Sequence, residues 1–214
     1  MLGDELVIEE YHTERAHEII NILEDQLPKK EKFVVTVAGE SGAGKSELAS
    51  EIARLNSENN IPTGILQQDD YFVFPPKTNH EMRRKNIDQV GTYEVKLDFL
   101  DSNLRSFKQG AKTIYKPLVN YDKDSISTEE MNVERFQVLI AEGTYTTSLE
   151  FADYRIFIDR DYKDTYSDRK RRGRDKLEPF IEDVLEREHE IISSHRNRAD
   201  LLITSDYGSV KRQV

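Results

Sequence analysis

Three glycines and a lysine lie close together in residues 39–46, which read GESGAGKS. Their spacing fits the pattern G-x-x-x-x-G-K-[ST], in which glycines permit positive φ angles and backbone N–H groups turn inward around phosphate oxygens. In this pattern Lys45 bridges the β- and γ-phosphates of a nucleoside triphosphate, and the Ser46 hydroxyl lies on Mg²⁺. The pattern therefore predicts a nucleotide-binding site formed by Gly39, Glu40, Ser41, Gly42, Ala43, Gly44, Lys45 and Ser46.

The segments on either side of this loop distinguish a phosphate site from an ordinary glycine-rich turn. Residues 33–37 (FVVTV) form a short β-branched run of the kind found in buried parallel strands. After the loop, Leu48, Ile52 and Leu55 recur at helical spacing. A strand, this loop and a helix, in that order, favour a nucleotide-phosphate site.

Two acids follow the next predicted strand, residues 63–67. Because carboxyl ends of parallel strands meet at one edge of a sheet, Asp69 and Asp70 are expected on the same edge as the glycine loop. A carboxylate there could approach the γ-phosphate and accept the proton of an attacking hydroxyl. Helix capping or a solvated turn is the structural alternative for this pair.

Two more strands end in an acid that could orient Mg²⁺ or its waters. Glu142 follows the apolar run 136–141, and Asp159 follows the strand predicted at 154–158. We prefer Glu142, because its strand is more uniformly apolar and should therefore be more central in the sheet.

A basic segment, RKRRGR, occupies residues 169–174. It could be a nucleic-acid-binding arm or a solvated helix face, but in an acidic chain with a phosphate loop a lid that lowers arginines onto phosphates is favoured. We place this lid at about residues 161–175, with Arg169 on the nucleotide.

Composition limits the class of protein. A chain of 214 residues is long enough for one α/β domain, and we interpret residues 1–214 as a single domain. A formal net charge of −10 argues against a nucleic-acid partner. The sequence contains no cysteine and no apolar run near the roughly 20 residues that span a bilayer, so we expect no membrane partner and a cytoplasmic location.

Hydrophobic patterns along the chain predict the other elements. Residues 1–30 form an extension with a short strand at 6–8 and a helix that carries Ala16, Ile19, Ile20 and Leu23. Residues 73–95 and 122–133 are expected to be loops, between which lie a helix from Leu97 and a strand at 113–121. A long helix over about 176–195 and a last strand at 201–204 complete an α/β fold, with a parallel sheet covered by helices on both faces.

The motifs AGESGAGKS, QQDDYF, VNYD, IAEG, RRGRD and ADLLI occur in the order found in one known group. The chain resembles the uridine kinase and phosphoribulokinase family of P-loop kinases over about residues 33–204. The resemblance implies a P-loop NTPase fold with an arginine-bearing lid, Asp69 as the catalytic base and an acceptor pocket next to it. Acceptor-binding residues implied by it are Asp88, the pair Tyr121 and Asp122, Arg172 and Arg174, and we add Glu142 to this set.

Two departures from the family pattern concern the acceptor. Nucleoside kinases of the family place an aromatic residue before the ribose-binding aspartate, whereas here Ile87 precedes Asp88. Those enzymes also carry a histidine a few residues beyond the Tyr-Asp pair, and residues 121–126 (YDKDSI) contain none. The phosphoryl-transfer motifs are therefore well matched, and the pyrimidine-reading motifs are not.

We therefore predict a small-molecule kinase that uses ATP and Mg²⁺ to phosphorylate an alcohol, in the manner of uridine kinase. A sugar, polyol or glycerate-like alcohol is the alternative acceptor. An NTP-hydrolysing regulatory switch is the alternative of a different class, although a switch of the small GTPase type usually carries an N-K-x-D motif, which this sequence lacks.

Overall fold

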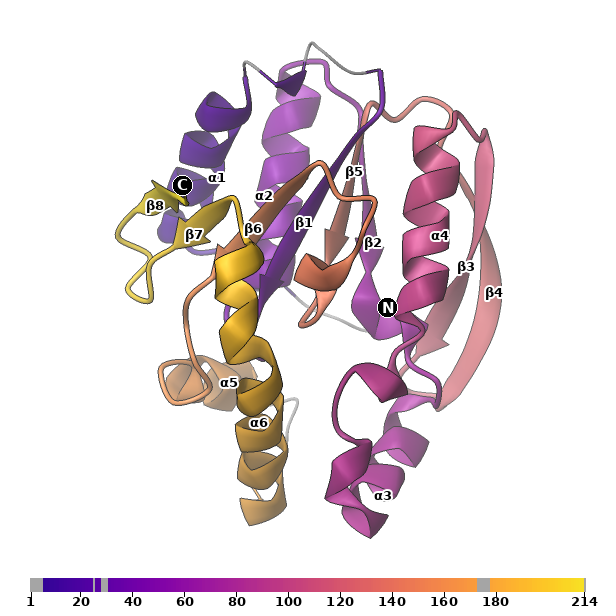
Figure 1. Ribbon diagram of the computed structural model, residues 1–214, viewed down its shortest axis with the longest axis vertical. Coiled ribbons are helices and arrows are strands. Elements are labelled where there is room, and N and C mark those ends of the chain that lie inside the picture. Colours follow the sequence, from indigo (N-terminus) through magenta and orange to yellow (C-terminus); the bar gives the residue numbers. More distant parts are fainter. Residues whose placement is uncertain (1–5, 25, 28–30, 173–177, 214) are drawn as a thin grey trace.

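The computed structural model describes residues 6–24, 26–27, 31–172 and 178–213. Its centre is a sheet of parallel strands (Figure 1). The strands lie in the order β2 (Thr63–Gln67), β5 (Val138–Glu142), β1 (Phe33–Gly39), β6 (Tyr154–Ile158) and β7 (Leu201–Ile203). A short antiparallel strand, β8 (Val210–Arg212), closes the edge beside β7. The register pairs Val37 with Glu142 and Gly39 with Ile158, so the carboxyl ends of β1, β5 and β6 meet at one edge.

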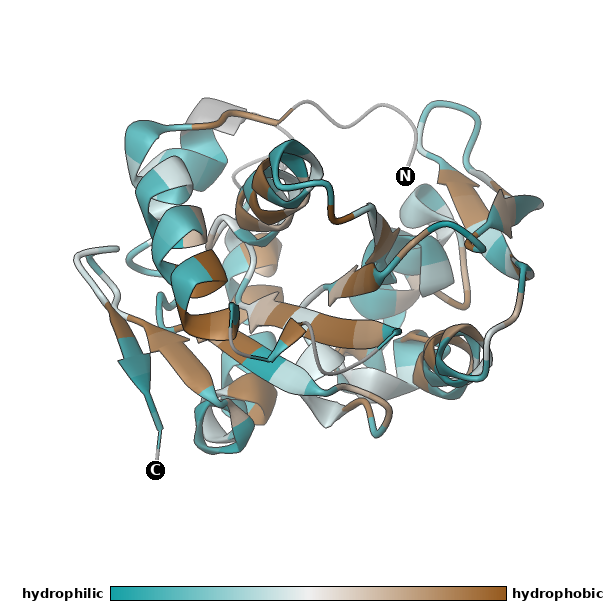
Figure 2. Cartoon of the chain, turned by 90° about the horizontal axis from the view of Figure 1, so that it is seen from above, coloured by the Kyte–Doolittle hydropathy of each residue, from teal (hydrophilic) through white to brown (hydrophobic). Residues whose placement is uncertain are grey.

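Strand β1 is buried at every position because helices and turns cover both faces of the sheet. Val35 and Val37 pack with helices α1 (Glu10–Leu23) and α2 (Lys45–Glu58). Val34 and Ala38 face the other way and pack with α4 (Leu97–Lys108). Seen from above, the central strands are hydrophobic and the surrounding helices carry most of the hydrophilic colour (Figure 2). This is the layered α/β arrangement that the alternation of strands and helices predicted.

Several elements lie at the margins of the sheet. Strands β3 (Thr113–Asn120) and β4 (Ser125–Asn132) form a separate antiparallel hairpin. Helices α3 (Pro76–Lys85), α5 (Tyr166–Arg172) and α6 (Pro179–Ile192) lie beyond the carboxyl edge of the sheet (Figure 1). Short 3₁₀ turns cover residues Gln68–Tyr71, Ile87–Gln89, Thr92–Glu94, Thr146–Ser148 and Ser193–Arg198.

The strands and helices of the core are confirmed, whereas three marginal segments differ from expectation. Residues 6–8 form no strand, and their large side chains are partly exposed. The polar stretch 73–95 contains helix α3, and the predicted loop 122–133 contains strand β4. Neither element shows an apolar periodicity, because α3 buries only Asn79 among its residues and β4 is largely exposed. Residues 173–175 of the expected lid lie outside the described residues.

None of the helices in the described residues has the length and apolar character required to cross a membrane.

Candidate active site

The glycine-rich loop between β1 and α2 has the backbone that a phosphate cradle requires. Gly42 and Gly44 have φ angles of 78° and 93°, in the left-handed region that side chains disfavour. A Cβ at Gly42 would meet Cγ of Arg169 at 2.6 Å, and one at Gly44 would collide with Tyr207 and His12. Both glycines are therefore required by conformation and by space. The loop ends at the first turn of α2, where helix N–H groups favour an anion.

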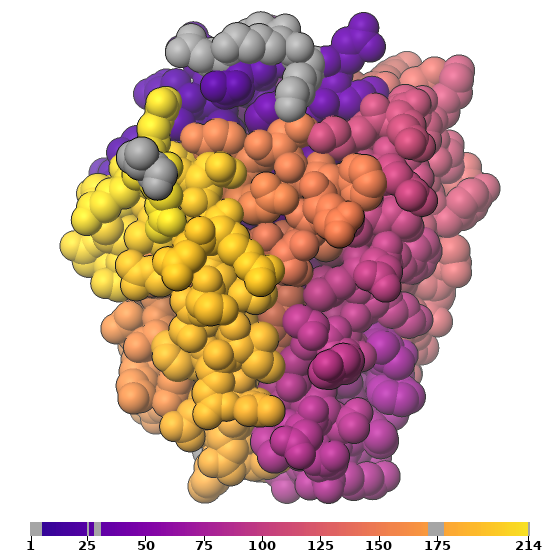
Figure 3. Space-filling model, in the orientation of Figure 1, coloured from indigo at the N-terminus to yellow at the C-terminus, as the bar shows by residue number. Residues whose placement is uncertain are grey.

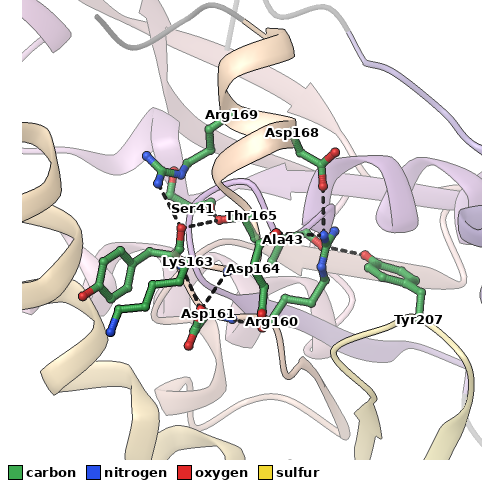
Figure 4. A network of polar contacts seen from close by, with 11 residues as sticks. Ser41, Ala43, Arg160, Asp161, Lys163, Asp164, Thr165, Asp168, Arg169 and Tyr207 are labelled. Atoms are coloured by element: carbon green, nitrogen blue, oxygen red, sulfur yellow. Dashed lines mark hydrogen bonds and ion pairs between the residues drawn. The ribbon is translucent and has the colours of Figure 1, made fainter. Parts of the chain in front are cut away.

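Two hydroxyl groups hold this loop from outside (Figure 4). Thr165 Oγ1 donates to the Ser41 carbonyl oxygen at 2.9 Å, and the Tyr207 hydroxyl donates to the Ala43 carbonyl oxygen at 2.6 Å. These bonds fix the orientation of successive peptide units, on which an N–H cradle for phosphate depends.

Lys45, Ser46 and Glu142 lie together at the mouth of the loop. Lys45 Nζ donates to the Glu40 carbonyl oxygen at 2.9 Å, and Ser46 Oγ donates to Glu142 Oε1 at 3.0 Å. Burial raises the pKa of Glu142 to about 7, and the charge of Asp69 adds to this rise, while Lys45 opposes it. A buried carboxylate with this raised pKa is stabilised by a cation beside it.

The oxygen atoms of Ser46 and Glu142 are the hard ligands that Mg²⁺ prefers. The described residues contain no cluster of three or more metal-ligating side chains. In phosphoryl-transfer sites Mg²⁺ is held by one or two protein oxygens, the nucleotide phosphates and water. The expected competitor, Asp159, instead pairs with Arg196 at 3.2 Å. Of the two acids, Glu142 is thus the one in contact with the Ser46 hydroxyl.

The structure separates Asp69 from Asp70. Asp70 is 1% exposed, pairs with Lys116 Nζ at 2.9 Å and accepts a hydrogen bond from the Val119 N–H at 3.0 Å. Asp69 is half-buried, and its charge acts on Glu142. Asp70 thus fastens the segment after β2 to strand β3, while the charge of Asp69 acts on Glu142.

Arg169 on α5 lies against the phosphate loop and is 4% exposed. Its Nη2 donates to the Tyr162 carbonyl oxygen at 2.9 Å and lies 3.4 Å from Glu182 Oε1. Its buried Nε and Nη1 have no hydrogen-bond partner among the described residues. A guanidinium with free donors beside a phosphate loop is suited to bind phosphate oxygens. The side chain of Arg172 and all of Arg174 lie outside the described residues.

The remaining expected acceptor residues are near the surface. The Asp88 side chain, in the 3₁₀ turn Ile87–Gln89, is 75% exposed and lies 3.8 Å from Nη2 of Arg187 on α6. Tyr121 is 41% exposed at the end of strand β3. The structure therefore brings Ser46 and Glu142 into contact, within reach of the charges of Lys45 and Asp69, and places Arg169 against the loop at Gly42. Asp88 and Tyr121 lie at the periphery.

Sequence reasoning missed a buried polar cluster next to this centre, formed by Arg83, Glu94, Tyr145 and Glu188. Arg83 contacts both carboxylates, at 2.6 Å from Glu94 Oε1 and 3.1 Å from Glu188 Oε1. No motif marks these residues, and Arg83 and Glu188 are 105 positions apart. The sequence shows Arg83 and Glu94 within the polar stretch 73–95, but nothing in it distinguishes them from charged side chains exposed to solvent.

A second missed contact joins the phosphate loop to α6. The Glu40 side chain accepts a hydrogen bond from the Tyr162 N–H at 2.7 Å, and its Oε1 lies 2.6 Å from His189 Nδ1. Burial raises the pKa of Glu40, although the hydrogen bond to His189 opposes this rise. Glu40 thus contributes a side-chain connection as well as backbone to the loop.

The phosphoribulokinase/uridine kinase family model matches residues 34–205. The chain belongs to this family. It is 29% identical over 196 residues to a bifunctional alpha-galactosidase/sucrose kinase of Mediterraneibacter gnavus, covering 85% of this chain and 21% of that protein. It is 24% identical over 184 residues to the uridine kinase of Leuconostoc citreum, covering 80% of this chain and 86% of the relative.

The fold likeness agrees with this membership. Phosphoribulokinase from Rhodobacter spheroides superposes with a TM-score of 0.63 at 12% identity, covering 81% of this chain and 70% of that chain. The chain is a small-molecule kinase with the P-loop NTPase fold. Kinases of this family use ATP as the phosphate donor. The regulatory-switch alternative is accordingly set aside.

Proposed function

We propose that the protein transfers the γ-phosphoryl group of ATP, with Mg²⁺, to a hydroxyl group of a small molecule. The observation that carries the proposal is the meeting of the phosphate loop, the Ser46–Glu142 pair and Asp69 at one edge of the sheet. Lys45 and the loop amides hold the phosphates, and Ser46 and Glu142 hold Mg²⁺, which neutralises phosphate charge when bound. Asp69 accepts the proton of the attacking hydroxyl, and Arg169 binds phosphate oxygens.

For the acceptor we propose a non-nucleoside alcohol, such as a sugar or polyol, in preference to uridine. Ile87 stands where the family's nucleoside kinases place a stacking aromatic ring, and residues 121–126 lack the base-reading histidine. A relative with a sucrose kinase activity in its name supports this choice. Uridine or cytidine is the second candidate, supported by the uridine kinase relative. Asp88, Tyr121, Arg172 and Arg174 stay proposed acceptor residues in either case.

The test is acceptor-dependent ADP formation with ATP and Mg²⁺, measured on uridine, cytidine, sugars and polyols in competition. We expect kcat/KM for at least one sugar or polyol to exceed that for both nucleosides. Lys45→Ala provides the blank and should abolish transfer with all of them, because the charge on the β- and γ-phosphates is lost. A pyrimidine nucleoside with kcat/KM far above every polyol would contradict the choice of acceptor.

A further inference from the structure

Helices α3 and α6 approach each other beside the transfer centre. Their surfaces meet in the space-filling view, where the yellow of α6 adjoins the purple and magenta of α3 and the following turns (Figure 3). Arg84 on α3 pairs with Glu178 just before α6, and the ring of Phe180 on α6 lies beneath the Arg84 guanidinium, 5.1 Å from its Cζ. These contacts join the first turn of α6 to the end of α3.

In the buried cluster between these helices, Glu94 is held by more hydrogen bonds than Glu188. Glu94 binds the Arg83 guanidinium twice, at 2.7 Å through Nε and 2.6 Å through Nη2. Glu94 in turn accepts hydrogen bonds from Asn79 Nδ2 at 2.9 Å and from the Gly91 N–H at 3.1 Å. Glu188, by contrast, contacts Arg83 through Oε1 at 3.1 Å. The positive charge of Arg83 is therefore satisfied mainly by Glu94, so that an ionised Glu188 would leave the cluster with one excess negative charge.

Glu188 is close to the transfer centre. It is 8% exposed, and the charges of Lys45 and Asp69 act on it as well as those of Arg83 and Glu94. Burial raises its pKa, and Arg83 opposes that rise. An ionised carboxylate accepts hydrogen bonds but donates none, so Glu188 is suited to the hydroxyl groups of a ligand.

Tyr145 supplies a second, independent indication of a ligand. It follows β5, is 1% exposed, and the charges that act on its hydroxyl belong to Glu188, Glu94 and Arg83. Yet this hydroxyl has no hydrogen-bond partner among the described residues. A buried hydroxyl without a partner is costly, and a bound ligand with hydroxyl groups would satisfy it.

From this geometry we infer that Glu188 and Tyr145 bind the acceptor, and that they select an uncharged, hydroxyl-rich molecule over an anionic one. The inference rests on the proposed function and narrows its acceptor class. The excess negative charge repels carboxylate- or phosphate-bearing alcohols, while the Glu188 carboxylate and the Tyr145 hydroxyl hydrogen-bond to hydroxyl groups. Arg83 and Glu94 are positioning residues that hold Glu188 in place.

The experiment uses matched acceptor pairs that differ in charge: glycerol with D-glycerate, and D-ribose with D-ribose 5-phosphate, together with sucrose. For the wild-type chain we expect kcat/KM to favour the neutral member of each pair by roughly tenfold or more. Glu188→Gln keeps the size of the side chain and removes the charge, so the neutral-to-anionic ratio should fall by roughly tenfold, chiefly through KM. Glu186→Gln, on the exposed face of the same helix, is the matched control and should keep the wild-type ratio.

Tyr145→Phe separates ligand binding from a structural role. Because the hydroxyl lacks a protein partner, its removal should leave the melting temperature unchanged or slightly higher. KM for the neutral acceptors should nevertheless rise by roughly threefold to tenfold, because a hydrogen bond to the acceptor is lost. Thermal unfolding of each variant shows that the comparison is made on folded protein.

The outcomes are distinguishable. A wild-type preference for D-glycerate or D-ribose 5-phosphate would overturn the inference, as would a Glu188→Gln variant with an unchanged ratio or a Tyr145→Phe variant with an unchanged KM. These results would leave the proposed phosphoryl transfer standing. A wild-type chain that phosphorylates no member of the panel, nor uridine or cytidine, would contradict the proposed function and this inference with it.

Discussion

At the scale of single residues, the neighbours Asp69 and Asp70 show how one position changes the role of the same side chain. Asp70 is buried with Lys116, which also lies 2.8 Å from Glu129 Oε2, and it accepts the Val119 N–H. It therefore ties the turn after β2 to the β3–β4 hairpin. Asp69 has no part in this attachment, and its charge acts on Glu142. Substitution of Asp69 should therefore affect turnover, and substitution of Asp70 should affect stability.

We predict that Asp69→Asn lowers kcat by roughly 10²- to 10⁴-fold while ATP binding and the melting temperature stay near wild-type values, because the proton acceptor alone is lost. Asp70→Asn should lower stability by about 1–3 kcal/mol, because the buried Lys116 loses a charged partner, and should reduce turnover far less. Steady-state kinetics and thermal unfolding of the two variants check both statements. A larger loss of turnover at Asp70 would show that the base has been assigned to the wrong residue.

Glu142 gives a prediction about pH. Its pKa is about 7 in the folded protein against an ordinary value of 4.5. Between these values the folded chain holds a proton that the unfolded chain releases, so stability falls as pH rises from about 4.5 to 7. This difference in pKa corresponds to at most about 3 to 4 kcal/mol of folding stability. Glu142→Gln should therefore unfold at a higher temperature than wild type at pH 8, with the gap closing near pH 4.5.

Melting temperatures of both proteins without nucleotide, followed from pH 4.5 to 8, provide the measurement. The same variant should gain less thermal stability from Mg²⁺ with ATP than the wild type does, because one oxygen ligand has lost its charge. If the two proteins show parallel pH profiles, Glu142 does not carry the shifted proton.

At the scale of elements, the phosphate loop depends on segments far away in the sequence. Tyr207, after β7, and Thr165, just before α5, bind its carbonyl oxygens from outside. The ring of Tyr207 also packs against Tyr11 and His12 of α1, at centroid distances of 4.8 and 5.3 Å. Helix α1 therefore supports the loop by packing against Tyr207. This helix lies before residue 34, where the match to the family model begins.

Tyr207→Phe tests this support. The ring contacts remain, but the Ala43 carbonyl oxygen loses its donor, so we expect a stability loss of about 1 kcal/mol and a KM for ATP raised by roughly threefold to tenfold. Thermal unfolding and kinetics at varied ATP provide the readout. Tyr93→Phe is the control, because Tyr93 is 90% exposed and its hydroxyl should matter to neither quantity. Equal effects of the two changes would speak against any role of the Tyr207 bond.

The sequence predicted those elements in which buried apolar residues recur at a regular spacing. Leu48, Ile52 and Leu55 mark α2, and each is at most 3% exposed. Helix α3 has no such apolar spacing. It is held to the rest of the protein by Arg83, whose partners Glu94 and Glu188 come from other segments. Strand β4 is mainly exposed and pairs with β3 through its backbone. Polar attachment and hairpin pairing leave no apolar pattern in the sequence.

In the candidate site, too, some residues could be placed from the sequence and others could not. The phosphate loop, Asp69 and Glu142 could be predicted, because a motif fixes the first and the parallel sheet places the others at the same edge. The surroundings of the acceptor could not, because Tyr145 and Glu188 come together only when α6 packs beside the sheet. Their residue types are also those of ordinary surfaces, so burial alone reveals them.

At the scale of the whole molecule, strand β8 ends the sheet in a way that bears on solubility. A strand at a sheet edge presents backbone N–H and C=O groups that can pair with another chain and start aggregation. Here the edge strand has three residues, two of which, Lys211 and Arg212, are exposed and positively charged. Two copies brought edge to edge would place like charges opposite each other over a very short ladder. Pairing of two copies through this edge of the hydrophobic sheet is therefore disfavoured.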